Sequence, residues 1–280
     1  MAKNKVILVT GGSSGIGYEA ARQLATMGHK VYAAARRTEL MEPLRQDGVT
    51  PLNLDVTDTA SIQACINHIL DKEGRIDVLV NNAGYGYFGA IECVSDTEAR
   101  RQMDVNVFGL AAMCRMVLPT MRKQHSGRIV NIASIAGRAV FSFGGWYNVS
   151  KYSVEALSDA LRIELQPFGI KVCIIEPGCI KTDWGLIAAD HLDHCSKNTD
   201  YEEIAHREAD AMRWVYTGSF LTKPERIAKA ITKAATASCP RTRYRLGSLS
   251  GTTMVMHALL PARCWDALVR RIMSIKIRVK

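Results

Sequence analysis

Short apolar runs of strand length alternate with longer segments of helical length along most of this chain. Four helical segments are Gly15–Met27, Ile62–Lys72, 96–121 and 147–166. Strands that are apolar throughout are typical of a parallel sheet covered by helices on both faces. With right-handed crossovers, the alternation predicts an α/β fold with a single doubly wound, Rossmann-type parallel sheet. The six strand-like runs are Val6–Thr10, Val31–Ala35, Thr50–Leu54, Ile76–Asn81, Arg128–Ala133 and Lys171–Glu176.

The domain organisation follows from where this alternation holds. It runs to about residue 180 and resumes near 223, so we expect one domain over 1–250, with 183–220 as a helical flap. Residues 251–280 form a C-terminal extension. No apolar run reaches the roughly 18 to 20 residues that span a bilayer. The eight cysteines are scattered, without a CxxC pair, which favours reduced thiols and a cytoplasmic protein.

The positive charge is concentrated at the C-terminal end. Lys and Arg exceed Asp and Glu by 36 − 27 = 9 over the whole chain. Residues 241–280 hold nine basic residues and one acid, a net +8, so residues 1–240 carry only +1. The last forty residues are therefore basic, and residues 1–240 are nearly neutral.

A glycine-rich loop follows the first predicted strand and opens a helix. Such glycines let the backbone approach a pyrophosphate, whose charge is stabilised by the free N–H groups of the helix N-terminus. A tight turn that binds nothing also uses glycine. We assign cofactor binding to Gly11, Ser13, Ser14, Gly15, Ile16 and Gly17.

Two arginines follow the second strand, where a dinucleotide-binding fold places the residue that contacts the adenosine ribose. Arg36 and Arg37 stand there, and no carboxylate is available for a ribose hydroxyl. A guanidinium suits a 2′-phosphate. The pair predicts NADP(H) rather than NAD(H), the alternative being solvated arginines at a helix start.

Polar and small residues also follow the other strands of the predicted sheet. In doubly wound sheets, ligands bind at the carboxyl ends of the strands. We therefore expect one site, at one edge of the sheet, to contain Asp55, Val56, Asn82, Ala83, Gly84, Ser134, Pro177, Gly178, Ile180 and Thr182.

Tyr147 and Lys151 are four residues apart at the start of a helix and share one face. A free tyrosine has a pKa of about 10, too high for acid–base chemistry at neutral pH. A nearby cation lowers the pKa of a phenol, so we expect Lys151, together with the positive nicotinamide of an oxidised cofactor, to activate Tyr147. Ser134, thirteen residues before Tyr147, would hydrogen-bond the substrate oxygen.

Together these motifs resemble the short-chain dehydrogenase/reductase family, of the NADP-preferring kind. The resemblance covers about residues 4–182, and the segments around Ala35-Arg36-Arg37 and Asn82–Ala90 resemble the hydroxysteroid and retinol dehydrogenase branch. It implies a catalytic tetrad of Asn106, Ser134, Tyr147 and Lys151, with hydride transfer between nicotinamide and carbonyl carbon and no metal.

The resemblance also implies more specific roles. Tyr147 would be the acid/base, and Lys151 would also bind the nicotinamide ribose. Asn106 would hold a water of a proton relay, Asp55 and Val56 would contact adenine, and Thr182 the carboxamide. Two subunits would pair through the helices that carry Asn106 and Tyr147, as a homodimer or homotetramer.

Aromatic residues in the predicted site segments favour a flat, apolar, steroid-like ketone or alcohol. These residues are Phe88, Phe141, Phe143, Trp146 and Trp184. A retinoid, a sugar, an acyl thioester, or a non-catalytic NADP(H) sensor are the alternatives.

Two further motifs admit more than one interpretation. The stretch His191–Cys195 suggests metal binding, but no fourth ligand is evident, and we expect exposed flap residues. Trp265, Leu268, Val269, Ile272 and Met273 form an amphipathic stripe, and Ile275–Lys280 alternates apolar and basic residues. We expect a helix that caps the substrate pocket, with peripheral membrane contact as the alternative. No aromatic–basic platform supports nucleic-acid binding.

Overall fold

The computed structural model describes residues 4–273 and contains one seven-stranded sheet, in the order β3-β2-β1-β4-β5-β6-β7. Every neighbouring pair of strands is parallel. The predicted doubly wound α/β class is therefore confirmed, and β7 is a strand that the sequence analysis did not identify. The strands are β1 (Val6–Thr10), β2 (Lys30–Ala35), β3 (Val49–Asn53), β4 (Val78–Asn81), β5 (Gly127–Ile132), β6 (Ile170–Pro177) and β7 (Arg243–Leu246).

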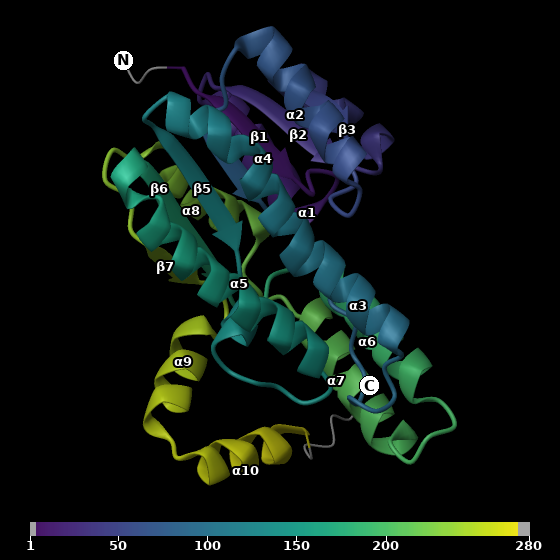
Figure 1. Cartoon of the computed structure of the whole chain (residues 1–280). Coiled ribbons are helices and arrows are strands. Elements are labelled where there is room, and N and C mark those ends of the chain that lie inside the picture. Colours follow the sequence, from purple (N-terminus) through teal and green to yellow (C-terminus); the bar gives the residue numbers. More distant parts are fainter. Residues whose placement is uncertain (1–3, 274–280) are drawn as a thin grey trace.

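Helices cover both faces of the sheet (Figure 1). Val6 and Leu8 of β1 pack into the core beneath α2, α4 and α5, while Ile7 and Val9 pack into the core beneath α1 and α8. Successive side chains of a strand point to opposite faces, which is why these strands are apolar throughout. The helices are α1 (Gly15–Thr26), α2 (Thr59–Glu73), α3 (Asp96–Met103), α4 (Leu110–Lys123), α5 (Gly145–Glu164), α6 (Trp184–Ser196), α7 (Glu202–Thr217) and α8 (Pro224–Thr236), with 3₁₀ segments at Thr38–Asp47, Ile135–Gly137 and Gln166–Phe168.

The helical segment predicted over 96–121 is confirmed, with a π-helical turn at Asp104–Gly109 between α3 and α4. The buried Asn106 side chain donates to the Tyr85 carbonyl (2.8 Å) and accepts from the Tyr85 N–H (3.0 Å). A Cβ on Gly109 would lie 2.8 Å from the Val56 carbonyl. The turn is thus fixed by tertiary contacts, and π-turns of this kind are frequent at functional sites.

Two helical pairs extend beyond the end of the sheet where the strands finish (Figure 1). One is α6 and α7, within the stretch 183–220. The other follows β7 and consists of α9 (Ser250–Leu259) and α10 (Ala262–Met273). Within residues 4–273, no helix is long and apolar enough to span a membrane. The predicted pattern at Ile275–Lys280 and the side chains of Ile272 and Met273 lie outside the described part of the chain.

Candidate active site

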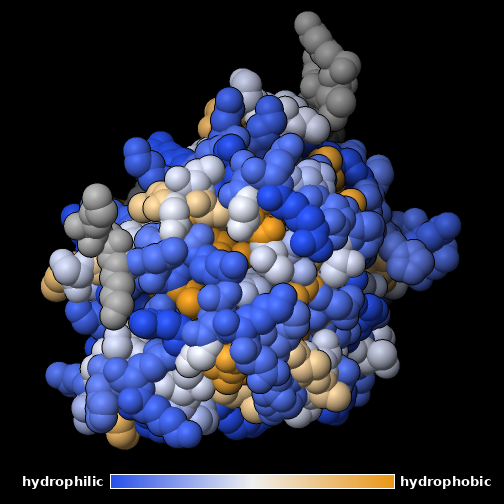
Figure 2. All heavy atoms as spheres, turned by 90° about the horizontal axis from the view of Figure 1, so that it is seen from above, coloured by the Kyte–Doolittle hydropathy of each residue, from blue (hydrophilic) through white to orange (hydrophobic). Residues whose placement is uncertain are grey.

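A cavity of about 1410 Å³ lies at the carboxyl ends of the strands. The opposite end of the molecule, seen from above in Figure 2, is mainly polar with small separate apolar patches. Gly17 and Asn106 are the predicted site residues that do not line the cavity. Those that do are Gly11, Ser13, Ser14, Gly15, Ile16, Arg36, Arg37, Asp55, Val56, Asn82, Ala83, Gly84, Ser134, Tyr147, Lys151, Pro177, Gly178, Ile180 and Thr182.

The glycine-rich loop is held in place by the end of β4. Asn82 Nδ2 donates to the carbonyls of Thr10 and Gly11, both at 3.1 Å. Thr10 Oγ1 accepts from the N–H groups of Asn82 and Ala83, again at 3.1 Å. A Cβ on Gly17 would lie 2.3 Å from both the Gly11 carbonyl and Asn82 Nδ2. Gly17 therefore packs α1 against the loop, and Thr10 is a positioning residue that the sequence analysis missed.

The phosphate-binding end of the cavity offers unpaired positive groups. The Ser14 side chain makes no capping bond to α1, and the first turn of α1 carries no acid, so its N–H groups are open to an anion. Arg36 and Arg37 are exposed, and no carboxylate among residues 4–273 pairs with them. Arg101, which the sequence analysis missed, also lines the cavity, but it pairs with Glu98 at 3.9 Å. This end fits a phosphorylated ribose.

Ser134, Tyr147 and Lys151 lie together at the other end of the cavity. Ser134 follows β5, and Tyr147 and Lys151 are in the first two turns of α5. Tyr147 and Ser134 share a hydrogen bond through their hydroxyl groups. Lys151 Nζ donates to the Ile132 carbonyl at 2.9 Å and lies 5.8 Å from the centre of the Tyr147 ring. Tyr147 is 9% and Lys151 8% exposed. The predicted trio is therefore together and in contact with the cavity, with Tyr147 and Lys151 buried and Ser134 half-buried.

The predicted lowering of the Tyr147 pKa also relies on the positive nicotinamide of an oxidised cofactor and stays a prediction, and burial acts against it. Burial raises the pKa of Tyr147 to about 12, with the Ser134 hydrogen bond opposing it. Burial likewise lowers the pKa of Lys151 to about 8, opposed by the charge of Glu155. Desolvation disfavours the charged form of each group. Tyr147 is consequently a protonated phenol at neutral pH, able to donate a proton.

Asn106 lies behind this trio. Its Nδ2 donates to Ser150 Oγ (3.0 Å) as well as to the Tyr85 carbonyl, so both amide protons are used. Ser150 is on α5, between Tyr147 and Lys151. The side chain therefore fixes the catalytic helix against the segment after β4, and its role in a water relay stays a prediction.

Three of the five predicted aromatic residues line the cavity: Phe88, Phe141 and Trp184. The Trp184 ring centre is 4.9 Å from that of Tyr147. Phe143 and Trp146 do not line the cavity, and Phe143 packs edge-on against Tyr201 of the flap. Lining residues of the flap and extension were missed because nothing local links them to the site: Met212, Val215, Tyr216, Leu249 and Met256.

The motif at 191–195 does not consist of exposed residues as expected. His191 lines the cavity, stacks on Tyr87 with ring centres 4.6 Å apart, and lies 3.3 Å from the Gly86 carbonyl. Cys195 donates to the Cys93 carbonyl at 3.1 Å. The motif thus anchors α6 to the segment after β4. No group of three potential ligands for a metal ion occurs within residues 4–273.

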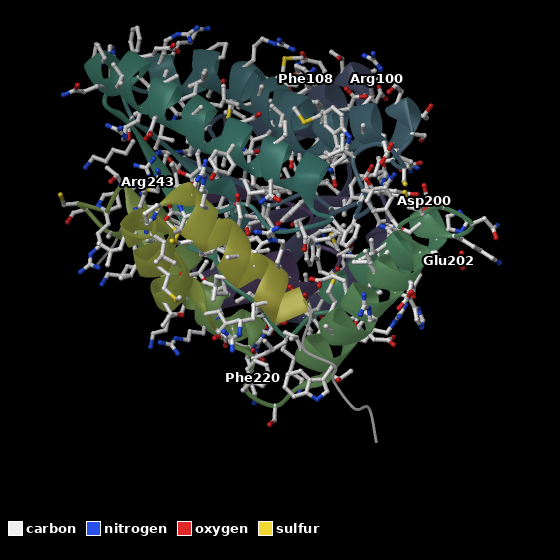
Figure 3. The ribbon with its side chains drawn as sticks, turned by 90° about the horizontal axis from the view of Figure 1, so that it is seen from below. Arg100, Phe108, Asp200, Glu202, Phe220 and Arg243 are labelled. Carbon is white, nitrogen blue, oxygen red and sulfur yellow. The ribbon has the colours of Figure 1, made fainter. Side chains whose placement is uncertain are left out.

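The C-terminal helix α10 closes one side of the cavity. Trp265, Leu268 and Val269 line it, and Trp265 Nε1 donates to the Val140 carbonyl at 3.2 Å. Seen from below in Figure 3, α10 lies across from α7, which begins at Glu202 and ends just before Phe220. This arrangement favours the pocket-capping interpretation of the extension.

The chain is similar in sequence and structure to known dehydrogenases and reductases. Residues 5–188 match the family model of the short chain dehydrogenases. A 3-ketodihydrosphingosine reductase from Bacteroides thetaiotaomicron is 36% identical over 259 residues, 88% of each chain. A short-chain dehydrogenase from Streptomyces avermitilis superposes with a TM-score of 0.78 at 34% identity, over 97% of this chain and 96% of that one. A serine dehydrogenase in its closed form with NADP⁺ has a TM-score of 0.76 at 28% identity, over 87% of this chain and 95% of that one.

The chain belongs to the short-chain dehydrogenase family and is an oxidoreductase of that family. The predicted resemblance is thereby confirmed.

Proposed function

We propose that this protein is an NADP(H)-dependent oxidoreductase that interconverts a hydrophobic secondary alcohol and its ketone. The observation that carries the proposal is one continuous cavity with two different ends. Unpaired Arg36 and Arg37 lie at one end. At the other end, Ser134 and the buried Tyr147 face apolar walls. The serine dehydrogenase with NADP⁺ supports the coenzyme.

The chain's own residues account for binding and proton transfer. The glycine-rich loop and the N-terminus of α1 would hold the pyrophosphate, and Arg36 and Arg37 the 2′-phosphate. When bound, NADPH supplies a hydride. Ser134 holds the substrate carbonyl oxygen, and Tyr147 donates its phenolic proton to that oxygen. Lys151, whose Nζ is fixed by the Ile132 carbonyl, stabilises the resulting phenolate.

We further propose a steroid-like substrate, because Phe88, Phe141 and Trp184 form flat apolar walls beside Tyr147. The Bacteroides relative, named as a 3-ketodihydrosphingosine reductase, supports an apolar ketone in a broader sense. A retinoid, sugar or acyl thioester carbonyl would use the same Tyr147 chemistry. A non-catalytic sensor of NADP(H) would need Arg36 but not a buried Tyr147–Ser134 hydrogen bond.

Subunit pairing and location complete the proposal. Phe108, labelled in Figure 3, is 63% exposed beside α4, and Val149 and Ile163 of α5 are 45% and 66% exposed. We propose that these apolar side chains are covered in a homodimer or homotetramer of a cytoplasmic protein. We propose no nucleic-acid partner. In this proposal α10 is a wall of the substrate pocket and does not contact a membrane.

Coenzyme discrimination tests the proposal. We expect the protein to oxidise NADPH in the presence of apolar ketones, with a much higher kcat/KM for NADPH than for NADH. Replacing both Arg36 and Arg37 by alanine removes two charge-assisted contacts to phosphate and should lower the NADPH preference by about 10- to 100-fold. Arg226→Ala, an exposed arginine of α8, is the control and should change nothing. Equal use of NADH by the wild type would contradict the assignment.

A further inference from the structure

One face of α7 forms a wall of the cavity, and a single charged residue interrupts it. The lining residues recur at intervals of three and four, so they share one face of the helix. From the start of α7 towards its end, they are Glu208, Ala211, Met212, Val215 and Tyr216. The carboxylate of Glu208 thus stands at one end of an otherwise uncharged surface.

Among the acids of the flap without a partner, Glu208 is half-buried, whereas Asp183, Asp200 and Glu203 are exposed. Arg213 pairs with Asp190 (2.9 Å), Asp193 (2.6 Å) and Asp210 (3.1 Å). No ion pair or hydrogen bond reaches Glu208 within residues 4–273, and burial alone raises its pKa. A partly buried carboxylate without a partner is costly to the fold. Its place on the cavity wall indicates that the missing partner is a ligand group.

The position of Glu208 relative to Tyr147 indicates how long a ligand that contacts both residues must be. Tyr216, at the other end of the wall, is in ring contact with Trp184 (6.2 Å), and Trp184 with Tyr147 (4.9 Å). Eight residues separate Tyr216 from Glu208, which is ~12 Å along a helix. A ligand whose carbonyl lies at Tyr147 would therefore reach Glu208 only with its far end.

The wall opposite α7 is apolar. It is formed by Trp265, Leu268 and Val269 of α10, and α10 faces α7 in Figure 3. The positive side chains of α10, Arg263, Arg270 and Arg271, are exposed. Between the reaction centre and Glu208, a substrate would thus meet hydrocarbon on both sides and then a hydrogen-bond acceptor.

We propose that Glu208 forms a distal subsite that binds a hydrogen-bond donor, an ammonium or a hydroxyl group, at the far end of an elongated apolar ketone or alcohol. The inference rests on the proposed function, since it takes Tyr147 as the reaction centre. It adds that the substrate is polar at both ends and that Glu208 determines specificity by binding the end that does not react.

The test uses four straight-chain methyl ketones of equal length, matched to the ~12 Å along α7. They end in methyl, hydroxyl, ammonium or carboxylate groups. Calorimetry with the NADP⁺-loaded full chain gives each Kd, and NADPH oxidation gives each kcat/KM. The variants are Glu208→Leu and Glu208→Gln. Glu203→Leu, an exposed glutamate on the same helix, is the matched control.

In the wild type and in Glu203→Leu, the hydroxyl or ammonium ketone should bind about 10- to 100-fold more tightly than the methyl ketone, as expected for a hydrogen bond to a charged group. Glu208→Leu should remove this preference while binding of the methyl ketone is kept. Glu208→Gln should retain the hydroxyl preference and lose the ammonium preference, which separates the two donors.

An unchanged preference in Glu208→Leu, or tightest binding of the carboxylate ketone by the wild type, would overturn the subsite. Failure of the proposed function looks different. In that case no ketone would be reduced although NADPH binds, whether or not the Kd values shift with Glu208. Reduction of all four ketones with equal Kd values would leave the proposed function intact and reject the subsite.

Discussion

Replacing Tyr147 by phenylalanine should lower kcat/KM for ketone reduction by about 10³-fold, the range expected for a lost general acid. The phenylalanine ring keeps the packing against Trp184 and Phe88 and removes only the hydroxyl that shares a hydrogen bond with Ser134. Because Arg36 and Arg37 are untouched, the Kd for NADPH should stay within about threefold. Steady-state kinetics and fluorescence titration of NADPH provide the two measurements.

Tyr152→Phe is the matched control for this variant. Tyr152 lies on the same helix, is 40% exposed and does not line the cavity. The kcat/KM of the Tyr152→Phe variant should therefore equal that of the wild type. Full activity of Tyr147→Phe would remove Tyr147 from the chemistry and contradict its role as the general acid.

Replacing Lys151 by methionine should lower kcat/KM by about 10²-fold or more and at the same time stabilise the fold at pH 7. Burial lowers the pKa of Lys151 from 10.5 to about 8, a cost of up to about 3 kcal/mol for the buried ammonium. Methionine leaves the Ile132 carbonyl without its donor, which offsets part of the gain. We expect a net increase of about 1–2 kcal/mol in the free energy of unfolding.

The pH dependence of stability checks this cause. Between about pH 8 and pH 10.5 the unfolded chain binds more protons at Lys151 than the folded chain does, so the stability of the wild type rises with pH in that window. Lys151→Met lacks this rise, and its advantage should shrink from pH 7 to pH 10. Denaturant unfolding at pH 7 and pH 10 measures the difference in free energy of unfolding between Lys151→Met and the wild type. If this difference is the same at both pH values, burial of the Lys151 charge is not its cause.

The fold and one half of the site could be predicted from the sequence because both depend on local patterns. Parallel strands such as β1 carry apolar residues towards two cores, and the residues just after them meet at one edge by topology alone. That rule placed the glycine-rich loop, Arg36, Asn82 and Ser134 in one cavity. The Tyr147–Lys151 spacing likewise put both side chains on one helix face.

What could not be predicted depends on tertiary burial. The pKa of Tyr147 rises because its neighbours exclude water, and a sequence motif does not show how deeply a side chain is buried. The π-turn at Asn106 is fixed by Tyr85, twenty-one residues earlier. Glu208 reaches the cavity only through the packing of α7, which no spacing in the sequence indicates.

The most direct test of hydride transfer uses NADPH that carries deuterium at nicotinamide C4. Incubation with an apolar ketone, followed by mass spectrometry of the alcohol, locates the label. The proposed function predicts one deuterium at the carbinol carbon of the wild-type product and about 10³-fold slower labelling with Tyr147→Phe. Tight binding of NADPH without transfer of deuterium to any carbonyl would contradict it.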